Sequence, residues 1–224
     1  MHALKRAPQA FVGLELRVPR ARKRTVAAGH HSRQKKAGQL SAEELEKRRQ
    51  AWKERQEKIA RATAKKNAVY SRLSIDYLQN RLSHPRGLHK ITSPFYVNRT
   101  IARYFKKHGR IFHKNPASIR HRGLDLRGRY GKPIYAVADG IVAIAEHMVF
   151  EGNFVVIDHG KGVFTGYMHQ SKLLVSEGQR VQAGQLLGNS GNTGASAGPH
   201  LHLALFMRGT YYEPLSLLSL PIRN

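Results

Sequence analysis

The pattern of apolar and polar positions divides the chain into four parts. Residues 1–40 are rich in Arg, Lys, Pro and Gly without a sustained period, which predicts a basic, extended or partly disordered arm. Residues 41–83 contain mostly helix formers, and we expect a basic helical segment there. Residues 84–120 mix basic and aromatic positions, which predicts a connector and a groove-forming loop. From 121 to 219, short apolar stretches alternate with glycine-rich turns, and this pattern predicts a separate β domain.

One long helix is predicted in the basic half. Ser41 and Glu44, in the letters "SAEE", have the spacing of a capping box, and good helix formers follow without Gly or Pro to about Ser71. The apolar stripe is thin, because its main positions, such as Leu45 and Trp52, recur only every seventh residue. One apolar residue per heptad is too few for a coiled-coil seam. We therefore expect the helix to lie against its own domain or to link to a domain further upstream.

The C-terminal half has the texture of an all-β domain. "PIYAVA" and "IVAIAEH" flank Asp139-Gly140, which predicts a hairpin. "NFVVIDHG" and "GVFTGYMHQ" predict a second pair of strands, and "HLHLALFMRGTYYEP" predicts a third pair that turns at Arg208-Gly209. About seven or eight short strands with frequent glycines favour a mainly β fold, an antiparallel sheet or sandwich of roughly 100 residues.

Charge is distributed unevenly along the chain. The net charge is +25, and residues 1–110 carry 28 Lys and Arg against 7 Asp and Glu, whereas residues 111–224 carry 11 against 7. Such a basic half favours a polyanionic partner, which could be nucleic acid, an acidic membrane surface or an anionic wall polymer. Charge alone does not choose among the three.

Composition also bounds the location and the kind of metal site. No run of 18 apolar residues occurs, so the sequence predicts no transmembrane segment. The first 20 residues lack the apolar stretch of a signal peptide, so the protein is either cytoplasmic or begins here after an export signal or anchor. Cysteine is absent, which excludes disulfides and cysteine-ligated metals.

Histidines are the candidate chemical groups. Most of the 13 have the default role of surface residues, and His159 in "IDHG" is expected to support a turn rather than bind a metal. His200 and His202 differ, because alternate residues of a strand point to the same face, about 6.5–7 Å apart. Two imidazoles in an apolar strand need polar partners, so they are either metal or catalytic groups or satisfied core histidines.

A second motif lies upstream of this pair. His121 and Asp125, in "HRGLDLRG", would be about 13 Å apart in a straight strand, too far to share one ion. A bend at Gly123 would bring them together. Histidine and carboxylate ligands suit Zn²⁺, and three protein ligands leave a fourth position open for water. The motif becomes specific only in combination with the later His169 and the two strand histidines.

At this point the sequence resembles the lysostaphin/LytM-type zinc metallopeptidases, which cut peptide cross-links of bacterial cell walls. The resemblance covers about residues 90–219, through "HRGLDLRGRYGKPIYAVADGIV", "VVIDHGKGVFTGYMHQ" and "GNSGNTGASAGPHLHLAL". It implies the family's antiparallel β-sheet catalytic core. One departure is Tyr96, which follows "SPF" where relatives commonly read "SPFG.R". The segment from Thr100 to Arg120 is also long and basic for the family.

The resemblance implies a role for five residues. It implies one Zn²⁺ per chain bound by His121, Asp125 and His202, with His169 and His200 as the non-ligand catalytic pair. It also implies hydrolysis of peptidoglycan cross-links or stem peptides by attack of a zinc-bound water. One histidine of the pair would orient or deprotonate that water and the other would bind the oxyanion, and the sequence does not say which.

Three alternatives remain beside the peptidase hypothesis. The chain could be a wall-binding activator of other hydrolases with an unused site. It could instead bind nucleic acid, but this leaves the histidines unexplained, so nucleic acid is the disfavoured partner. The basic N-terminal region could also fold over the groove as an inhibitory arm. We expect residues 1–110 to hold anionic wall or membrane polymers, and a location in the cell envelope, periplasmic or secreted.

Overall fold

The computed structural model describes residues 41–74, 82–85, 90–107 and 110–218, with side chains for all of these except 100–117. The predicted arm 1–40 and residues 75–81 therefore lie outside the described residues. In chain order the elements are α1 (Ala42–Tyr70), β1 (Ile91–Ser93), β2 (Asn98–Lys107), β3 (Arg110–Arg120), β4 (Leu124–Arg127), β5 (Pro133–Tyr135), β6 (Gly140–Met148), β7 (Gly152–Asp158), β8 (Val163–Leu173), β9 (Arg180–Val181), β10 (Leu186–Ser190), β11 (His200–Met207), β12 (Thr210–Tyr212) and α2 (Pro214–Leu218).

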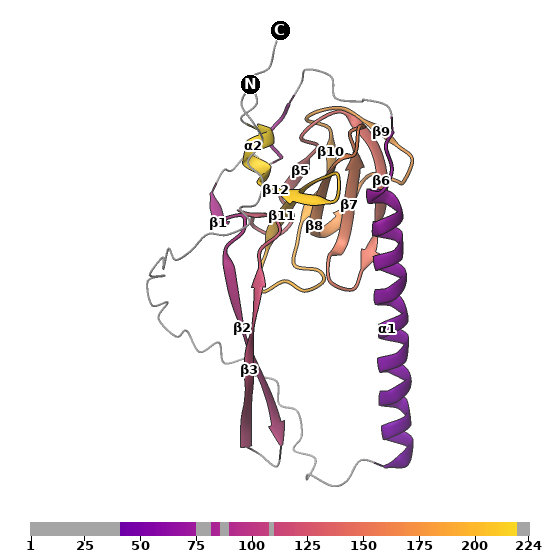
Figure 1. Cartoon of the computed structure of the whole chain (residues 1–224), viewed down its shortest axis with the longest axis vertical. Helices are drawn as coiled ribbons and strands as arrows, with labels where there is room; N and C mark the ends of the chain where they lie inside the picture. The colour runs from indigo at the N-terminus through magenta and orange to yellow at the C-terminus, as the bar shows by residue number, and fades with distance from the viewer. Residues whose placement is uncertain (1–40, 75–81, 86–89, 108–109, 219–224) are drawn as a thin grey trace.

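An antiparallel sheet forms the body of the protein (Figure 1). Its strands run in the order β1-β4-β11-β8-β7-β6-β9, with β12 paired to β11, and with β10 paired to both β5 and β8. Strands β2 and β3 form a separate two-stranded hairpin that projects from the sheet (Figure 1). The predicted fold class, a mainly β antiparallel core with a helical N-terminal region, is confirmed.

The sheet buries apolar side chains on both faces because its strands alternate. In β11, the odd-numbered residues from Leu201 to Leu205 enter a large core cluster that also contains residues of β4, β5, β7 and β10. The even-numbered residues from His200 to Phe206 lie on the opposite face. On that second face, Phe206 packs against a smaller cluster built from β6, β7, β8 and helix α1. The two strand histidines therefore share a face with α1.

Helix α1 begins as the sequence predicts and packs on this second face with its C-terminal part. Ser41 is its N-cap, and the capping box with Glu44 is complete. Near the other end, Val69 is buried and the Tyr70 ring stacks on Phe206 with centroids 4.2 Å apart. The N-terminal half extends past the sheet (Figure 1), and Trp52 there is 64% exposed. The expectation that the helix lies against its own domain is confirmed for its C-terminal part.

The predicted hairpin around Asp139-Gly140 is wrong. Strand β5 pairs with β10, whereas β6 pairs with β7 and β9. Asp139 is held by residues distant in sequence: its Oδ1 accepts the Ala183 N–H, and its carbonyl lies 2.6 Å from Nδ1 of His159. The dipeptide thus joins two different strand pairs instead of closing a two-residue turn. The other two predicted pairs, β7 with β8 and β11 with β12, are confirmed.

Strands also form where the sequence pattern predicts a connector. Most of residues 91–120 is in β1, β2 and β3, with β2 and β3 paired along their length. The groove-forming loop expected within 84–120 is thus largely a hairpin. Basic residues interrupt the alternation there, so no strand signal stood out in the sequence. Within the described parts of the chain, no helix is long and apolar enough to cross a membrane.

Candidate metal centre

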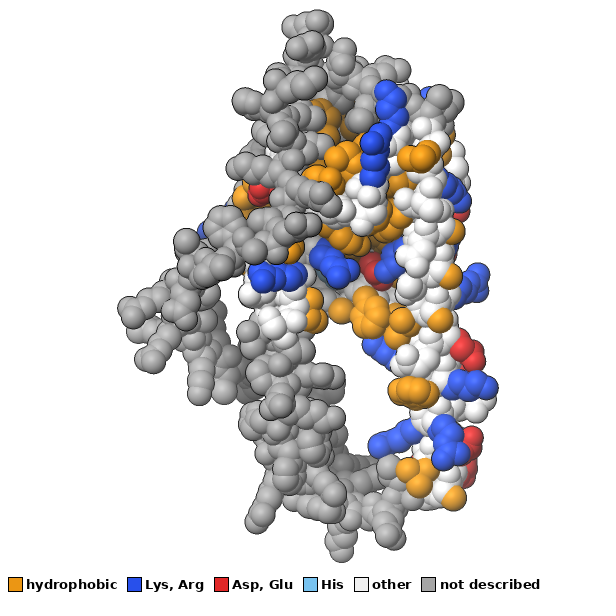
Figure 2. Space-filling view, in the orientation of Figure 1, with side chains coloured by type: hydrophobic (Ala, Val, Ile, Leu, Met, Phe, Trp, Pro, Cys, Tyr) orange, Lys and Arg blue, Asp and Glu red, His pale blue; other side chains and the backbone are white. Residues whose placement is uncertain are grey.

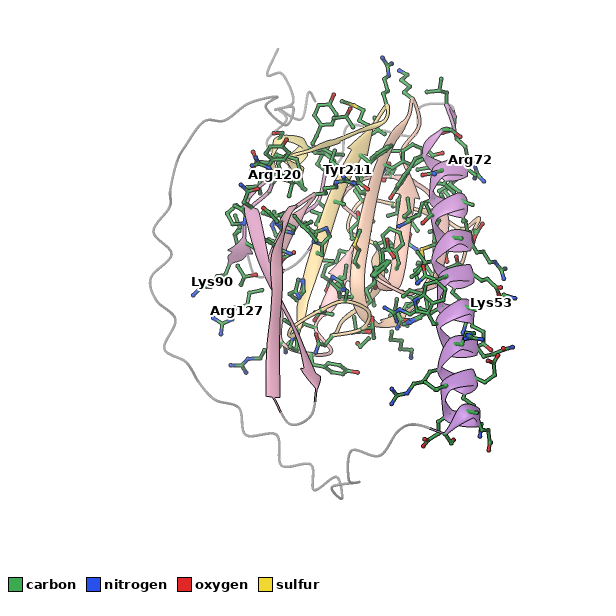
Figure 3. The ribbon with its side chains drawn as sticks, turned by 60° about the horizontal axis from the view of Figure 1, so that its bottom comes forward. Lys53, Arg72, Lys90, Arg120, Arg127 and Tyr211 are labelled. Atoms are coloured by element: carbon green, nitrogen blue, oxygen red, sulfur yellow. The ribbon has the colours of Figure 1, made fainter. Side chains whose placement is uncertain are left out.

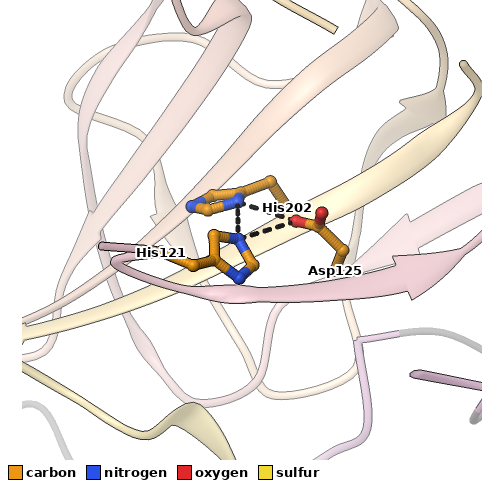
Figure 4. Close-up of side chains that lie close together, drawn as sticks. All are labelled: His121, Asp125 and His202. Atoms are coloured by element: carbon orange, nitrogen blue, oxygen red, sulfur yellow. Dashed lines mark hydrogen bonds and ion pairs between the residues drawn. The ribbon is translucent and has the colours of Figure 1, made fainter. Parts of the chain in front are cut away.

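Three buried side chains, two from the neighbouring strands β4 and β11 and one from the segment that joins β3 to β4, meet at one point (Figure 4). His121 Nε2 lies 3.1 Å from Oδ1 of Asp125 and 3.0 Å from Nδ1 of His202. The third separation, from His202 Nδ1 to Asp125 Oδ1, is 2.8 Å. His202 and Asp125 are opposite partners in the antiparallel pair of β11 with β4, so both project from the same face. Three potential ligand atoms therefore form a nearly equilateral triangle.

Gly123 makes this convergence possible. The chain bends there, and strand β4 begins only at Leu124, so His121 is not held in line with Asp125 as a straight strand would hold it. A Cβ on Gly123 would lie 2.4 Å from Nε2 of His202 and 2.6 Å from the carbonyl oxygen of Leu203. No side chain fits at that distance, so only glycine lets the bend pack directly against the third side chain of the triangle.

Outer contacts orient the triangle. His121 Nδ1 is 2.7 Å from the Pro94 carbonyl oxygen, which can only accept, so Nδ1 carries the proton and Nε2 presents its lone pair. Arg99 donates to Oδ2 of Asp125, which leaves Oδ1 directed at the two histidines. The backbone around Pro94 is itself tied to His121, because Tyr96 N–H donates to the His121 carbonyl.

His169 and His200 lie beside the triangle. Their ring centroids are 4.8 Å apart, and Nε2 of His200 is 3.6 Å from Oδ1 of Asp125. The glycine-rich loop that follows β10 supplies a carbonyl to each: Thr193 O is 2.9 Å from Nδ1 of His169, and Gly198 O is 2.8 Å from Nδ1 of His200. Each carbonyl fixes the proton on Nδ1. Each Nε2 can therefore accept a proton or, once protonated, donate a hydrogen bond.

Backbone strain accompanies the position of His169. Its φ of +64° lies in the left-handed region, which a non-glycine residue enters at a cost of roughly 1–3 kcal/mol. The conformation is held because its N–H donates to the Glu151 carbonyl, 2.8 Å away. The Glu151 carboxylate in turn pairs with Lys66 of helix α1. A chain of contacts thus links α1 to the backbone of a site histidine.

Electrostatics keep the cluster in the forms that bind cations. Burial raises the pKa of the Asp125 carboxyl, but the neighbouring His121 and His202 side chains outweigh burial and hold that pKa well below its usual range. Burial lowers the pKa of His202 despite the Asp125 hydrogen bond, and it lowers the pKa of His169 to about 4. At neutral pH the site therefore combines the Asp125 carboxylate with the neutral imidazoles of His202 and His169.

This donor set fits a zinc ion. Two ligand atoms, each about 2.0–2.1 Å from a tetrahedral Zn²⁺, stand roughly 3.3 Å apart. The three observed separations of 2.8–3.1 Å need to open by only a few tenths of an ångström. Two neutral imidazoles and one carboxylate are the ligand types of catalytic zinc sites, in which a fourth position stays open. The triangle of His121, Asp125 and His202 can thus hold the ion.

The structure brings all five residues singled out in the sequence to one place. His159 lies elsewhere, fully buried, with Nε2 2.7 Å from the Thr165 hydroxyl, in agreement with a turn-supporting role. The sequence pattern did not identify Arg99 as a site residue, because its position just after "SPFYVN" is the only sign of a role at the site. Tyr96, the departure from the "SPFG.R" pattern, has a φ of +65°, which explains why glycine is the easier residue there.

Comparisons with known proteins agree with this geometry. Residues 119–214 match the family model described as Peptidase family M23. Peptidoglycan DD-endopeptidase ShyA of Vibrio cholerae is 47% identical over 89 residues, which are 40% of this chain and 21% of ShyA. DD-carboxypeptidase/endopeptidase Mpg of Neisseria meningitidis is 38% identical over 97 residues, which are 43% of this chain and 22% of Mpg. The chain thus spans about one fifth of the length of these curated relatives.

A solved structure matches over a larger part of the chain. The crystal structure of a peptidase M23 from Pseudomonas aeruginosa superimposes with a TM-score of 0.60 at 30% identity, over 74% of this chain and 62% of that one. The sheet and the buried His-Asp-His triangle together define a metallopeptidase domain of the lysostaphin/LytM type. The match to peptidase family M23 places residues 119–214 in a domain of this type.

Proposed function

We propose that the protein is a zinc-dependent endopeptidase that hydrolyses peptide cross-links or stem peptides of bacterial peptidoglycan. The observation that carries the proposal is the meeting of His121, Asp125 and His202 in one triangle, with two further histidines beside it, in a domain of family M23. ShyA is a peptidoglycan DD-endopeptidase and Mpg is a DD-carboxypeptidase/endopeptidase, and both activities support the substrate class.

The chemistry follows from the donor set. When bound, Zn²⁺ lowers the pKa of a coordinated water from 15.7 toward about 7 and polarises a carbonyl oxygen. His121, Asp125 and His202 would hold the ion, and we assign them that role. Arg99 keeps the second carboxylate oxygen of Asp125 occupied, so that the carboxylate offers one oxygen to the site.

His169 and His200 would move the proton. Each ring, in its neutral form, presents an Nε2 lone pair, because a backbone carbonyl fixes the proton on its Nδ1. One ring accepts a proton from the attacking water as the new C–O bond forms, and it gives that proton to the leaving amine as the C–N bond breaks. The other ring, once it carries a proton on Nε2, donates to the developing oxyanion. A positioned acid–base group contributes about 10²–10⁴ in rate.

The wider setting is also part of the proposal. We place the protein in the cell envelope, where its substrate lies, with residues 121–219 as the catalytic domain and the basic residues 1–110 as the region that adheres to anionic wall or membrane polymers. Helix α1 packs on the sheet, so adhesion is tested by removing residues 1–40 alone. Loss of binding to purified sacculi would support adhesion through residues 1–40, whereas unchanged binding would exclude this segment from the adhesive region.

Site-directed variants test the enzymatic proposal. The purified full chain should contain about one zinc per molecule and release peptides from isolated sacculi without another hydrolase. Asp125→Ala and His202→Ala should lose both zinc and cleavage, since each removes a ligand. His169→Ala and His200→Ala should keep zinc and lose about 10²–10⁴ in cleavage rate.

The matched control is His147→Ala. His147 lies in β6 and its Nδ1 is 3.0 Å from the side-chain oxygen of Asn153, in exposed surroundings. This variant should keep both zinc and cleavage. A wild-type protein that holds zinc yet releases nothing from sacculi, and only stimulates a second hydrolase, would establish the activator alternative and overturn the proposal.

A further inference from the structure

A large open pocket lies between helix α1 and the end of the sheet. Its volume is about 900 Å³. Thr63, Lys66 and Tyr70 of α1 form one wall, and Phe206 contributes to its floor. Figure 2 shows this face hollowed beside α1, with hydrophobic side chains on the floor and Lys and Arg side chains at the margin. The opposite wall includes Tyr211, which Figure 3 shows at the end of the sheet.

The pocket is positively charged. Three cationic side chains line it: Lys66, Arg122 and Arg208. Lys66 is neutralised by Glu151, but within the described part of the chain no carboxylate lies within 4 Å of Arg122 or Arg208. The guanidinium of Arg122 lies over the Tyr211 ring, 5.5 Å from its centroid, which fixes its direction. Two exposed arginines thus remain as unneutralised positive charges.

The aromatic groups of the pocket add no compensating charge. Burial raises the pKa of Tyr70 and of Tyr211, so both phenols stay neutral at physiological pH. Tyr70, Phe206 and Tyr211 instead offer flat apolar surfaces, with Tyr70 stacked on Phe206 and Tyr211 edge-on to it. The pocket therefore suits a ligand with an apolar stem and an anionic end.

The pocket and the metal centre lie on the same face of β11. His202 and Phe206 are four residues apart on the same face of β11, which places them about 13 Å apart. Their partners on β8, Met168 and Phe164, are likewise on this face. An extended peptide advances about 3.3–3.6 Å per residue, so about four residues span the distance from the metal centre to the pocket.

We propose that this pocket is a substrate subsite that binds a carboxylate of the peptide, about three to four residues from the bond that is cut, through Arg122 and Arg208. The inference deepens the proposed function and rests on it. Peptidoglycan stem peptides carry free carboxylates, and a guanidinium pairs with a carboxylate through two parallel hydrogen bonds. Residues 1–40 are a poor alternative occupant, because they carry ten Lys and Arg against one Glu and would be repelled.

The test uses two cross-linked peptides that differ only in one carboxylate, free in one and amidated in the other, placed about four residues from the scissile bond. The wild-type full chain should cleave the free acid with a kcat/KM about five- to tenfold higher, mainly through KM, because the contact is remote from the reacting atoms. Arg208→Gln should remove most of this preference while zinc content and kcat stay close to wild type. Arg208→Lys should retain part of it.

Arg61→Gln is the matched control. Arg61 lies two positions before Thr63 on α1, so it points to nearly the opposite side of the helix from the pocket wall, and the variant removes the same charge. It should keep the preference. Arg122→Gln provides a second, independent loss, and its zinc content is checked because residue 122 follows His121 in the chain.

The outcomes separate this inference from the proposed function. Equal cleavage of the two peptides by wild type, or an unchanged preference in both Arg208→Gln and Arg122→Gln, would overturn the subsite while leaving the peptidase intact. Cleavage of neither peptide, combined with calorimetric binding of the free acid that Arg208→Gln abolishes, would support the subsite and refute the peptidase. Arginine-dependent binding of a phosphate polymer, without any preference between the peptides, would assign the pocket to another ligand.

Discussion

Replacing Gly123 by alanine tests how the metal centre is assembled. The new Cβ would lie 2.4 Å from Nε2 of His202 and 2.7 Å from its Cε1, and 2.6 Å from the carbonyl oxygen of Leu203. Ordinary contacts need about 3.4 Å or more, so the imidazole or the β11 backbone must move by roughly 1 Å. Zinc–ligand distances tolerate only about 0.2 Å, so this displacement removes His202 from the ligand set.

The expected loss can be given in numbers. Overpacking at a buried position costs about 1–3 kcal/mol, and disturbing the residues that orient a ligand costs about 10–100-fold in metal affinity. Gly123→Ala should therefore remain folded and bind zinc at least tenfold more weakly. Competition with a chromogenic chelator measures that affinity, and urea unfolding of the metal-free protein measures the stability.

A control separates metal binding from general destabilisation. Gly178 has a φ of +85° and open space around its missing Cβ, so Gly178→Ala is strained by its backbone alone, far from the ligands. It should lose about 1 kcal/mol of stability and keep wild-type zinc affinity. If Gly123→Ala binds zinc as tightly as Gly178→Ala does, the reasoning about the bend is refuted.

Three further predictions follow from single contacts. Arg99→Met frees Oδ2 of Asp125, so zinc affinity should fall about tenfold in the same chelator assay, and an unchanged affinity would contradict an orienting role. Lys66→Met leaves the Glu151 carboxylate buried without its partner, so the free energy of unfolding measured in urea should fall by about 1–3 kcal/mol. The control is Lys47→Met, which should lose less than about 0.5 kcal/mol because the ion pair of Lys47 with Glu43 is exposed. Burial lowers the pKa of His159 in the folded protein below the unfolded value of 6.5, so the unfolded chain binds the proton first as the pH falls. The free energy of unfolding should therefore fall as the pH drops below about 6.5, by up to about 1.4 kcal/mol per pH unit. His159→Gln should flatten that slope in the metal-free protein, and an unchanged slope would show that His159 is not its source.

The long helix and the alternating strands could be predicted because local signals determine them. The capping box of Ser41 and Glu44 marks the start of α1, and the glycine-rich turns bound β7, β8, β11 and β12. Asp139-Gly140 misled the prediction because its partners, Ala183 and His159, lie far away in the sequence. A dipeptide propensity reports local turn preference and contains no information on such contacts.

The site was predictable as a set of residues but not as a geometry. His200 and His202 share a face by strand periodicity, and Gly123 marks the bend that His121 needs. The contacts that hold these rings come from backbone carbonyls, such as Pro94 and Thr193, which every residue type possesses. No composition or spacing signal can identify a carbonyl group, so only the folded chain reveals these contacts.

The pocket beside α1 was hidden for a similar reason. Lys66, Arg122 and Arg208 are separated by 56 and 86 residues in a chain that already has 39 Lys and Arg, so no cluster stands out. Only the packing of Tyr70 on Phe206 brings the helix over the end of β11 and closes a wall around these charges.

Cleavage of a defined cross-linked peptide by the purified, zinc-loaded full chain tests the central claim most directly. Mass spectrometry of the products should show one hydrolysed peptide bond, with no cleavage by Asp125→Ala at equal protein concentration and wild-type cleavage by His147→Ala. Equal cleavage by Asp125→Ala and wild type, or no product from a wild-type protein that contains one zinc per chain, would contradict the account.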